Sequence, residues 1–224
     1  NLNKVRARIQ AAEQEYGREN GAVTLIAVSK TKPVELLREA IEAGQQVFGE
    51  SYLQEALDKQ QTLSDQALEW HFIGPIQSNK TRPLAENFDW VHSVDRLKIA
   101  QRLNDQRPAD KPVLNVMLQV NISGEDSKAG VTVNELKTLV ESVIQLPRLK
   151  LRGLMAIPLR TEDFSEQRRV FRQLAELKTQ LNADYGLNMD CLSMGMSGDL
   201  EAAIAEGATH VRIGTDIFGA REYK

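Results

Sequence analysis

The sequence contains few of the features that mark secreted or membrane proteins. It has a single cysteine, Cys191, which excludes an internal disulfide and favours a reducing compartment. No apolar stretch approaches the roughly 18 residues needed to cross a membrane. The N-terminal segment is polar and has a helical pattern, unlike a signal peptide. We therefore expect a cytoplasmic protein with no attachment to a membrane.

Aromatic residues and excess positive charge are also scarce. Aromatics make up 5% of the chain, so we expect a core of aliphatic side chains and alanine, as is common in α/β folds. Lys and Arg total 28 against 31 Asp and Glu, and no basic run with interleaved aromatics is present, so nucleic acid is not an expected partner. With 224 residues and 42% apolar content, the chain suits one sizeable core better than two. We expect one domain over residues 1–224 and a monomer.

What the sequence does contain is a regular alternation of strand and helix patterns. An amphipathic helix, with apolar residues at steps of three and four from Leu2 to Tyr16, comes first. Eight strands are predicted at 23–29, 46–49, 69–74, 90–93, 113–121, 149–157, 190–194 and 210–213. Seven helices are predicted between them, at 33–44, 51–63, 77–87, 95–103, 133–145, 163–181 and 199–206. Pro83 is expected to interrupt the third of these, and Asp95 to cap the fourth.

This alternation indicates parallel strands joined by helical crossovers. Eight such units in one compact chain favour a closed (β/α)8 TIM barrel over an open sheet. The predicted fold is therefore a single-domain α/β barrel with an extra N-terminal helix. In this fold, active sites are built from the loops that follow the strands, and phosphate commonly binds after strands seven and eight.

Two glycine-containing turns occupy those phosphate positions. Met194-Gly195-Met196-Ser197-Gly198-Asp199 follows the seventh strand, and Gly214-Thr215 follows the eighth. Glycine lets the backbone approach an anion, N–H groups at a helix N-terminus supply donors, and Ser197 and Thr215 add hydroxyls. Each turn alone is also an ordinary strand-to-helix connection. Their joint placement favours a phosphate site.

A lysine and an arginine complete the candidate site. Lys30 follows the first strand and shares side-chain parity with Ile26 and Val28, so in a closed barrel it faces the two turns. If burial lowers its pKa, its amine can attack an aldehyde; the alternative is a solvated lysine. Together with an anion site, such an amine points to pyridoxal phosphate. Arg212 lies inside the last strand, where it either pairs with an acidic residue or donates to a ring nitrogen.

Other polar residues carry weaker signals. His71, His92 and His210 show no metal-ligand spacing with one another or with Cys191, so we expect core or surface roles and no metal site. Lys128 lies in the polar loop after the fifth strand. From there it could contact a ligand at the barrel mouth, or it could be a solvated charge.

Several segments resemble the pyridoxal-phosphate homeostasis proteins, and the resemblance covers essentially the whole chain. The segments that carry it are Ala27-Val28-Ser29-Lys30-Thr31-Lys32-Pro33, Phe48-Gly49-Glu50-Ser51-Tyr52, Trp70-His71-Phe72-Ile73-Gly74, Leu192-Ser193-Met194-Gly195-Met196-Ser197 and Val211-Arg212-Ile213-Gly214-Thr215. The resemblance implies the fold-type III barrel shared with the N-terminal domain of alanine racemase. One departure is Ser51, where those proteins commonly have asparagine.

The resemblance also implies a role for each candidate residue. Lys30 would form the Schiff base with pyridoxal 5'-phosphate, and Arg212 would contact the ring nitrogen. Ser197, Gly214 and Thr215 would bind the phosphate, and Lys128 matches a loop lysine linked to cofactor exchange. The expected function is to hold the cofactor and take part in its homeostasis and delivery, with apo pyridoxal-phosphate enzymes as transient partners and with no catalytic residue.

Two enzymatic functions are alternatives to a cofactor carrier, and the sequence argues against each. An amino-acid racemase needs a base on each face of its substrate, and racemases of this fold type take the second base, a tyrosine, from another domain. The sequence ends about ten residues after Gly214, so we expect no such domain. A Schiff-base aldolase would carry its lysine on the sixth strand, where residues 151–158 offer none. A racemase assay on pure protein would separate the first alternative from a cofactor carrier.

Overall fold

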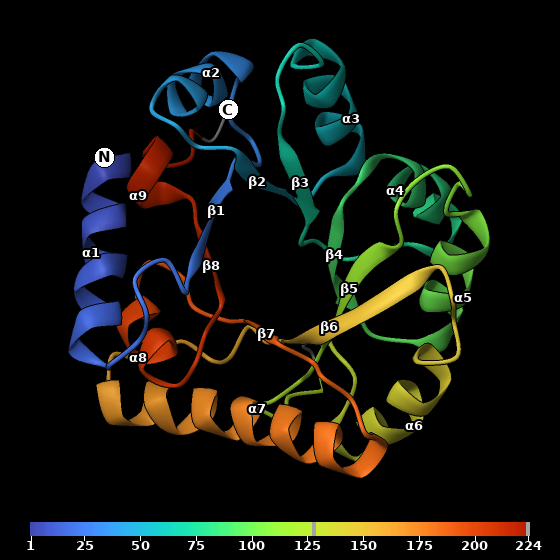
Figure 1. Ribbon diagram of the computed structural model, residues 1–224. Coiled ribbons are helices and arrows are strands. Elements are labelled where there is room, and N and C mark those ends of the chain that lie inside the picture. The colour runs from blue at the N-terminus through green and yellow to red at the C-terminus, as the bar shows by residue number, and fades with distance from the viewer. Residues whose placement is uncertain (127–128, 223–224) are drawn as a thin grey trace.

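Eight parallel strands close into a barrel in which each strand pairs with the next along the chain and β8 pairs with β1. The computed structural model describes residues 1–126 and 129–222, and Figure 1 shows the strands as an inner ring surrounded by helices. The strands are β1 (Thr24–Val28), β2 (Val47–Glu50), β3 (Glu69–Phe72), β4 (Trp90–Val94), β5 (Leu114–Gln119), β6 (Leu149–Met155), β7 (Cys191–Ser193) and β8 (His210–Ile213). The predicted barrel is confirmed.

The helices form the outer layer. They are α1 (Leu2–Glu15), α2 (Val34–Glu42), α3 (Leu53–Thr62), α4 (Thr81–Asn87), α5 (Leu97–Gln106), α6 (Val133–Val143), α7 (Phe164–Tyr185), α8 (Leu200–Ala205) and α9 (Thr215–Phe218), with a 3-10 turn, η1 (Ser78–Lys80), before α4. The predicted N-terminal helix, α1, packs beside α8 and α9, so it braces the last two strand-to-helix turns (Figure 1). Among the described helices, none combines the length and apolarity that a membrane span requires.

Two local predictions were wrong, and one short helix was missed. Pro83 does not interrupt α4 but lies in its first turn, where the missing N–H would have no helical partner. Asp95 does not cap α5, because its carboxylate pairs with the Arg96 guanidinium at 3.3 Å and the helix begins at Leu97 without a side-chain cap. The short helix α9 was not predicted, since four residues are too few to show a helical period.

The apolar side chains form two layers because strand residues alternate between the two faces of the sheet. The larger layer packs between strands and helices. The smaller one lies inside the barrel and consists of Trp90, Met117, Met155 and Cys191. These four belong to β4, β5, β6 and β7, where their chain neighbours belong to the outer layer.

The barrel interior also holds an unusual amount of polar side chain. His71 and His92 are fully buried, and His210 and Arg212 nearly so. Burial lowers the pKa of His92 well below its ordinary value and that of His210 to about 3, so both rings are neutral near pH 7. Within the barrel, polar groups therefore extend below the mouth, where the candidate site lies.

Candidate functional site

Three neighbouring strands, β7, β8 and β1, bring the candidate residues to one rim of the barrel. Ala27 pairs with Ile213, so Val28 lies beside Gly214, and Lys30 follows two residues after Val28. The backbone N–H of Arg212 donates to the Gly195 carbonyl at 2.9 Å, which joins the turn after β7 to β8. The turn that contains Ser197, the turn at Gly214 and Thr215, and Lys30 therefore lie at the carboxyl ends of three adjacent strands.

Two glycines in these turns are required by close packing. A Cβ at Gly214 would lie 3.2 Å from the Val28 carbonyl oxygen. Gly195 has a φ of 105°, and a Cβ there would lie 2.8 Å from the Ala203 Cβ. Ser197 is half-buried, and Thr215 is exposed as the first residue of α9. Both turns therefore keep the backbone close to the barrel wall and leave hydroxyls at the surface.

Arg8 of α1 holds the two turns together and was not singled out from the sequence. Its Nε and Nη2 donate to the Glu201 carboxylate at 2.9 Å each, and Nη1 donates to Asp216 Oδ2 at 3.2 Å. Nη2 also donates to the Ser197 carbonyl at 3.0 Å. One guanidinium from the extra N-terminal helix thus fixes the turn after β7 against the first turn of α9.

Lys30 occupies an environment that favours a reactive amine. Its side chain is half-buried at the end of β1. Burial lowers the pKa of Lys30, the nearby Arg221 charge lowers it further, and Glu50 opposes both. A lowered pKa increases the fraction of neutral amine, which is the form that attacks a carbonyl.

Three side chains, Lys59, Glu50 and Glu55, hold the backbone of the turn that carries Lys30, and we call them the Lys59 clamp. Thr31 has a left-handed φ of 65°, and its N–H donates to Glu55 Oε1 at 2.6 Å. The Lys59 ammonium donates to the Ser29 carbonyl at 2.6 Å and to Glu50 Oε1 and Glu55 Oε1 at 2.7 Å each. All three protons of Lys59 are thereby used. A non-glycine residue in this conformation costs free energy, so the clamp offsets strain beside Lys30.

Glu50 is the counter-charge inside this clamp. Its carboxylate is fully buried; Oε1 accepts from Ser29 Oγ at 2.6 Å as well as from Lys59, and Oε2 has no partner in the described structure. Burial raises the pKa of Glu50, while the charge and hydrogen bond of Lys59 oppose the rise. Glu50 therefore sits under the lysine turn and supports it.

Arg212 projects from β8 into the buried end of the site. Its Nη1 donates to Ser193 Oγ at 2.5 Å and its Nη2 to the Ala156 carbonyl at 3.0 Å. No carboxylate among the described residues lies within ion-pair distance of it, so the alternative of an acidic partner is not supported. Burial lowers the pKa of Arg212 to about 10, against the opposing charge of Asp199, so the group stays protonated at neutral pH.

The residues present fit pyridoxal phosphate. A half-buried lysine follows β1, and the glycine-containing turns with their hydroxyls follow the adjacent strands β7 and β8. A buried guanidinium on β8 uses only two of its five N–H groups on described protein atoms. An aromatic nitrogen can accept a hydrogen bond from one of the N–H groups that this guanidinium leaves unused.

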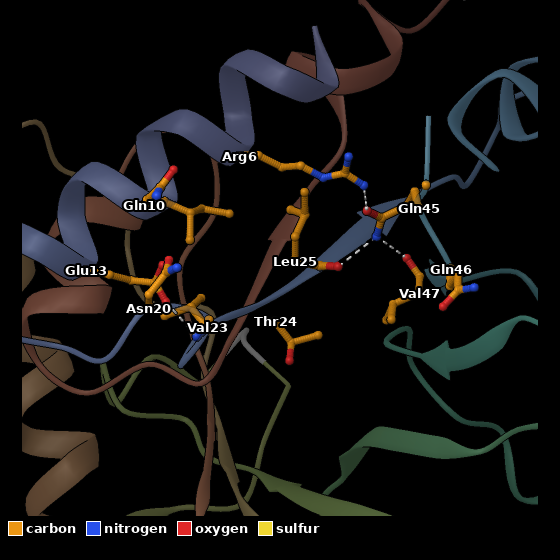
Figure 2. A pocket seen from close by; sticks show the side chains of 13 residues that line it. Arg6, Gln10, Glu13, Asn20, Val23, Thr24, Leu25, Gln45, Gln46 and Val47 are labelled. Carbon is orange, nitrogen blue, oxygen red and sulfur yellow. Dashed lines mark hydrogen bonds between the residues drawn. The ribbon is translucent and has the colours of Figure 1, made fainter. Parts of the chain in front are cut away.

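One predicted residue is not described by the structure, and one pocket lies away from the rim that β7, β8 and β1 form. Lys128 is outside the described residues. Figure 2 shows a separate pocket at the amino ends of β1 and β2, under α1. The volume of this pocket is about 500 Å³. There Arg6 donates to the Gln45 side chain at 3.1 Å, and Gln45 donates to the Leu25 and Val47 carbonyls at 2.8 Å each. The described residues that line this pocket include no lysine that could form a Schiff base, so the pocket is not a second candidate for the cofactor.

Comparison with known proteins shows the family to which this chain belongs. The family model of the alanine racemase N-terminal domain matches residues 1–222. The pyridoxal phosphate homeostasis protein of Pseudomonas aeruginosa is 62% identical over 223 residues, covering 100% of this chain and 95% of the relative. That of Escherichia coli K12 is 56% identical over 226 residues, covering 100% and 96%. This chain belongs to the pyridoxal phosphate homeostasis protein family.

Solved structures with the same barrel fold are also similar to this chain. PipY of Synechococcus elongatus PCC7942, solved with PLP bound, is 38% identical with a TM-score of 0.83, over 94% of this chain and 100% of that one. Alanine racemase of Corynebacterium glutamicum is 18% identical with a TM-score of 0.71, over 98% of this chain and 61% of that one. The second likeness shows the shared barrel alone.

We predict that Lys59→Met destabilises the protein by about 3–5 kcal/mol, because it leaves the buried Glu50 carboxylate without its cation. Lys137→Met is the matched control, since Lys137 is 60% exposed and pairs with Asp184 at the surface. It should cost about 0–1 kcal/mol. Urea unfolding of both variants measures the difference. Equal unfolding midpoints for Lys59→Met and the parent protein would show that the clamp contributes nothing to stability.

Proposed function

We propose that this protein binds pyridoxal 5'-phosphate, holds it as a Schiff base on Lys30, and takes part in cytoplasmic homeostasis and delivery of the cofactor. The main support is the seam of β7, β8 and β1, which brings an amine of lowered pKa beside two anion-type turns and above a buried guanidinium. The relatives named above, and PLP in the PipY structure, support the same reading.

The phosphate would bind between the turn at Ser197 and the turn at Gly214 and Thr215. Gly214 presents its backbone without a Cβ, so a tetrahedral anion can approach the N–H groups of this turn closely. The Ser197 and Thr215 hydroxyls supply further donors. The bracing of both turns by Arg8 keeps the distance between them fixed, so little ordering is needed on binding.

The aldehyde would react with the Lys30 amine, forming a carbon–nitrogen double bond with loss of water. Only the neutral amine can attack, and the half-buried position of Lys30 increases its neutral fraction. The clamp of Lys59, Glu50 and Glu55 fixes the backbone on both sides of Lys30, so the amine is oriented before the cofactor arrives.

Arg212 would meet the pyridine nitrogen as a donor that does not give up its proton. The ring nitrogen then stays unprotonated, which weakens the ring as an acceptor of electrons from a bound amino acid. This contact alone does not separate a carrier from a racemase, since racemases of this fold type also use an arginine there. With the homeostasis relatives as the main support, we propose that the protein carries the cofactor without turnover and transfers pyridoxal phosphate transiently to apo-enzymes. We also propose that it acts as a monomer. A racemase of the same fold remains the alternative; the likeness to alanine racemase at 18% identity supports the fold alone.

We predict that Lys30→Ala abolishes the visible absorption band that pyridoxal phosphate gives with the parent protein, because the covalent link is lost. The matched control is Lys32→Ala, two residues away, whose ammonium donates to the Gly219 and Ala220 carbonyls at 3.1 and 2.8 Å. It should retain the band. A band of unchanged position and intensity in Lys30→Ala would assign the Schiff base to another lysine.

We predict that Gly214→Val weakens cofactor binding more than Thr215→Ala does, since a side chain at 214 crowds the backbone donors and the Val28 carbonyl. Loss of the Thr215 hydroxyl removes one bond to a charged phosphate, worth about 1.5–3 kcal/mol. Thr179→Ala, at an exposed threonine of α7, is the control and should bind as the parent does. Parent-like dissociation constants in both seam variants would place the phosphate elsewhere.

A further inference from the structure

A continuous chain of hydrogen bonds crosses the barrel interior from Arg212 to Glu69. Arg212 Nη1 lies 2.5 Å from Ser193 Oγ, and Ser193 Oγ lies 2.7 Å from His92 Nδ1. His92 Nε2 lies 2.7 Å from His71 Nδ1, and His71 Nε2 lies 2.6 Å from Glu69 Oε1. We call these five residues the barrel chain. It runs from β8 and β7 to β4 and β3 on the opposite side of the ring of strands (Figure 1).

The barrel chain is buried except at its far end. Ser193, His92 and His71 are fully buried and Arg212 is 4% exposed, whereas the Glu69 side chain is 46% exposed at the amino end of β3. The barrel chain therefore connects the buried end of the proposed cofactor site to solvent at the amino-terminal rim of the barrel. The other functions assigned above use only Arg212 from this set.

The chemistry of the two ends fixes the direction of every bond. A guanidinium can only donate, so Ser193 accepts from Arg212, and the serine proton is left for His92 Nδ1. His92 must then carry its proton on Nε2 and donate it to His71 Nδ1. His71 in turn carries its proton on Nε2 and donates it to the Glu69 carboxylate. In this arrangement the Ser193 hydroxyl and the ring N–H groups of His92 and His71 each have an acceptor.

The reverse direction leaves groups unsatisfied. If His92 donated from Nδ1, the buried Ser193 proton would have no acceptor among its partners in the structure. His71 would then have to donate from Nδ1, and its bare Nε2 would face a carboxylate oxygen at 2.6 Å. Adding a second proton to His71 would remove that clash, but burial lowers the pKa of His71 and opposes it. The forward arrangement is the one that buried groups tolerate.

We propose that Ser193, His92, His71 and Glu69 are positioning residues that hold the Arg212 guanidinium in one orientation toward the pyridine nitrogen of the cofactor. This inference rests on the proposed function for its ligand and on the barrel chain for its mechanism. The Ser193 hydroxyl accepts a hydrogen bond from Arg212 Nη1, and the Ala156 carbonyl accepts one from Nη2. Because the Ser193 hydroxyl donates its proton to His92 Nδ1, its oxygen lone pairs are left to accept from Arg212. The hydrogen bonds from His92 to His71 and from His71 to Glu69 hold His92 in the form that accepts this proton.

The same interior offers matched controls. The His210 ring centroid lies 5.9 Å from those of His71 and His92, but its Nδ1 bonds to the Thr209 hydroxyl, outside the barrel chain. Asp190 is a carboxylate at the amino end of β7, paired with Arg152 rather than with a histidine. Substituting either removes a buried ring or a rim charge without breaking the barrel chain.

The first test needs no cofactor and no variant. Long-range proton–nitrogen NMR correlation on the parent protein reports which nitrogen of each histidine carries the proton. The expected result is protonation at Nε2 alone in both His71 and His92 near pH 7. Protonation of His92 at Nδ1, or of His71 at both nitrogens, would overturn the directed chain. This outcome does not depend on whether pyridoxal phosphate binds.

The second test is a spectroscopic titration with pyridoxal phosphate. Ser193→Ala should raise the dissociation constant on the order of tenfold or more and shift the visible band, because it removes a bond to a charged group. Ser193→Thr, which keeps the hydroxyl, should restore both. Glu69→Gln, at the exposed end of the barrel chain, should change the dissociation constant and the band position in the same direction as Ser193→Ala but by less. His210→Asn and Asp190→Asn should match the parent in both quantities.

Failure of the proposed function and failure of this inference give different results. If the parent protein gives no visible band with pyridoxal phosphate, the proposed function fails while the NMR result stands by itself. If the parent binds and Ser193→Ala and Glu69→Gln keep its affinity and its spectrum, the barrel chain does not position Arg212. An effect of Ser193→Ala that Ser193→Thr does not restore would also contradict the proposal, since it would reflect packing alone.

Discussion

The pairing of β8 with β1 is the contact on which the rest of the site depends. It closes the sheet, and its register sets Val28 beside Gly214 and Lys30 beyond them. Residues near opposite ends of the chain thereby meet at one rim. Arg8 reinforces the same closure from outside, because it ties α1 to the turns after β7 and β8. The closure of the barrel therefore brings Lys30, the glycine-containing turns and Arg212 to adjacent strands.

Inside the barrel, the fold keeps polar groups in places where apolar side chains would pack more simply. The Lys59 clamp beneath Lys30 and the barrel chain behind Arg212 each hold buried charged groups through several short hydrogen bonds. Such networks are a poor way to gain stability, since desolvation opposes them. Their placement directly behind the two charged groups of the site indicates that they serve orientation. Glu50 Oε2, which has no hydrogen-bond partner among the described residues, lies in the Lys59 clamp.

The sequence predicted what depends on local period and parity, and it failed where partners are distant. Alternation of strands and helices predicted the barrel, and the parity of Ile26, Val28 and Lys30 placed the lysine at the mouth. The bond of Arg8 to Glu201 spans 193 positions and that of His92 to Ser193 spans 101, so no local pattern could reveal them. The histidines carried a usable signal: each lies within a predicted strand, where an inward-facing ring needs a partner.

Borohydride reduction of the cofactor-loaded protein, followed by peptide mass spectrometry, tests the central claim most directly. Reduction makes the link between lysine and cofactor permanent, so the modified residue can be read without reference to affinity or activity. The account predicts a single pyridoxyl adduct on the peptide that contains Lys30, with the adduct absent from Lys30→Ala. An adduct on another lysine of the parent protein, at equal or greater occupancy, would contradict it.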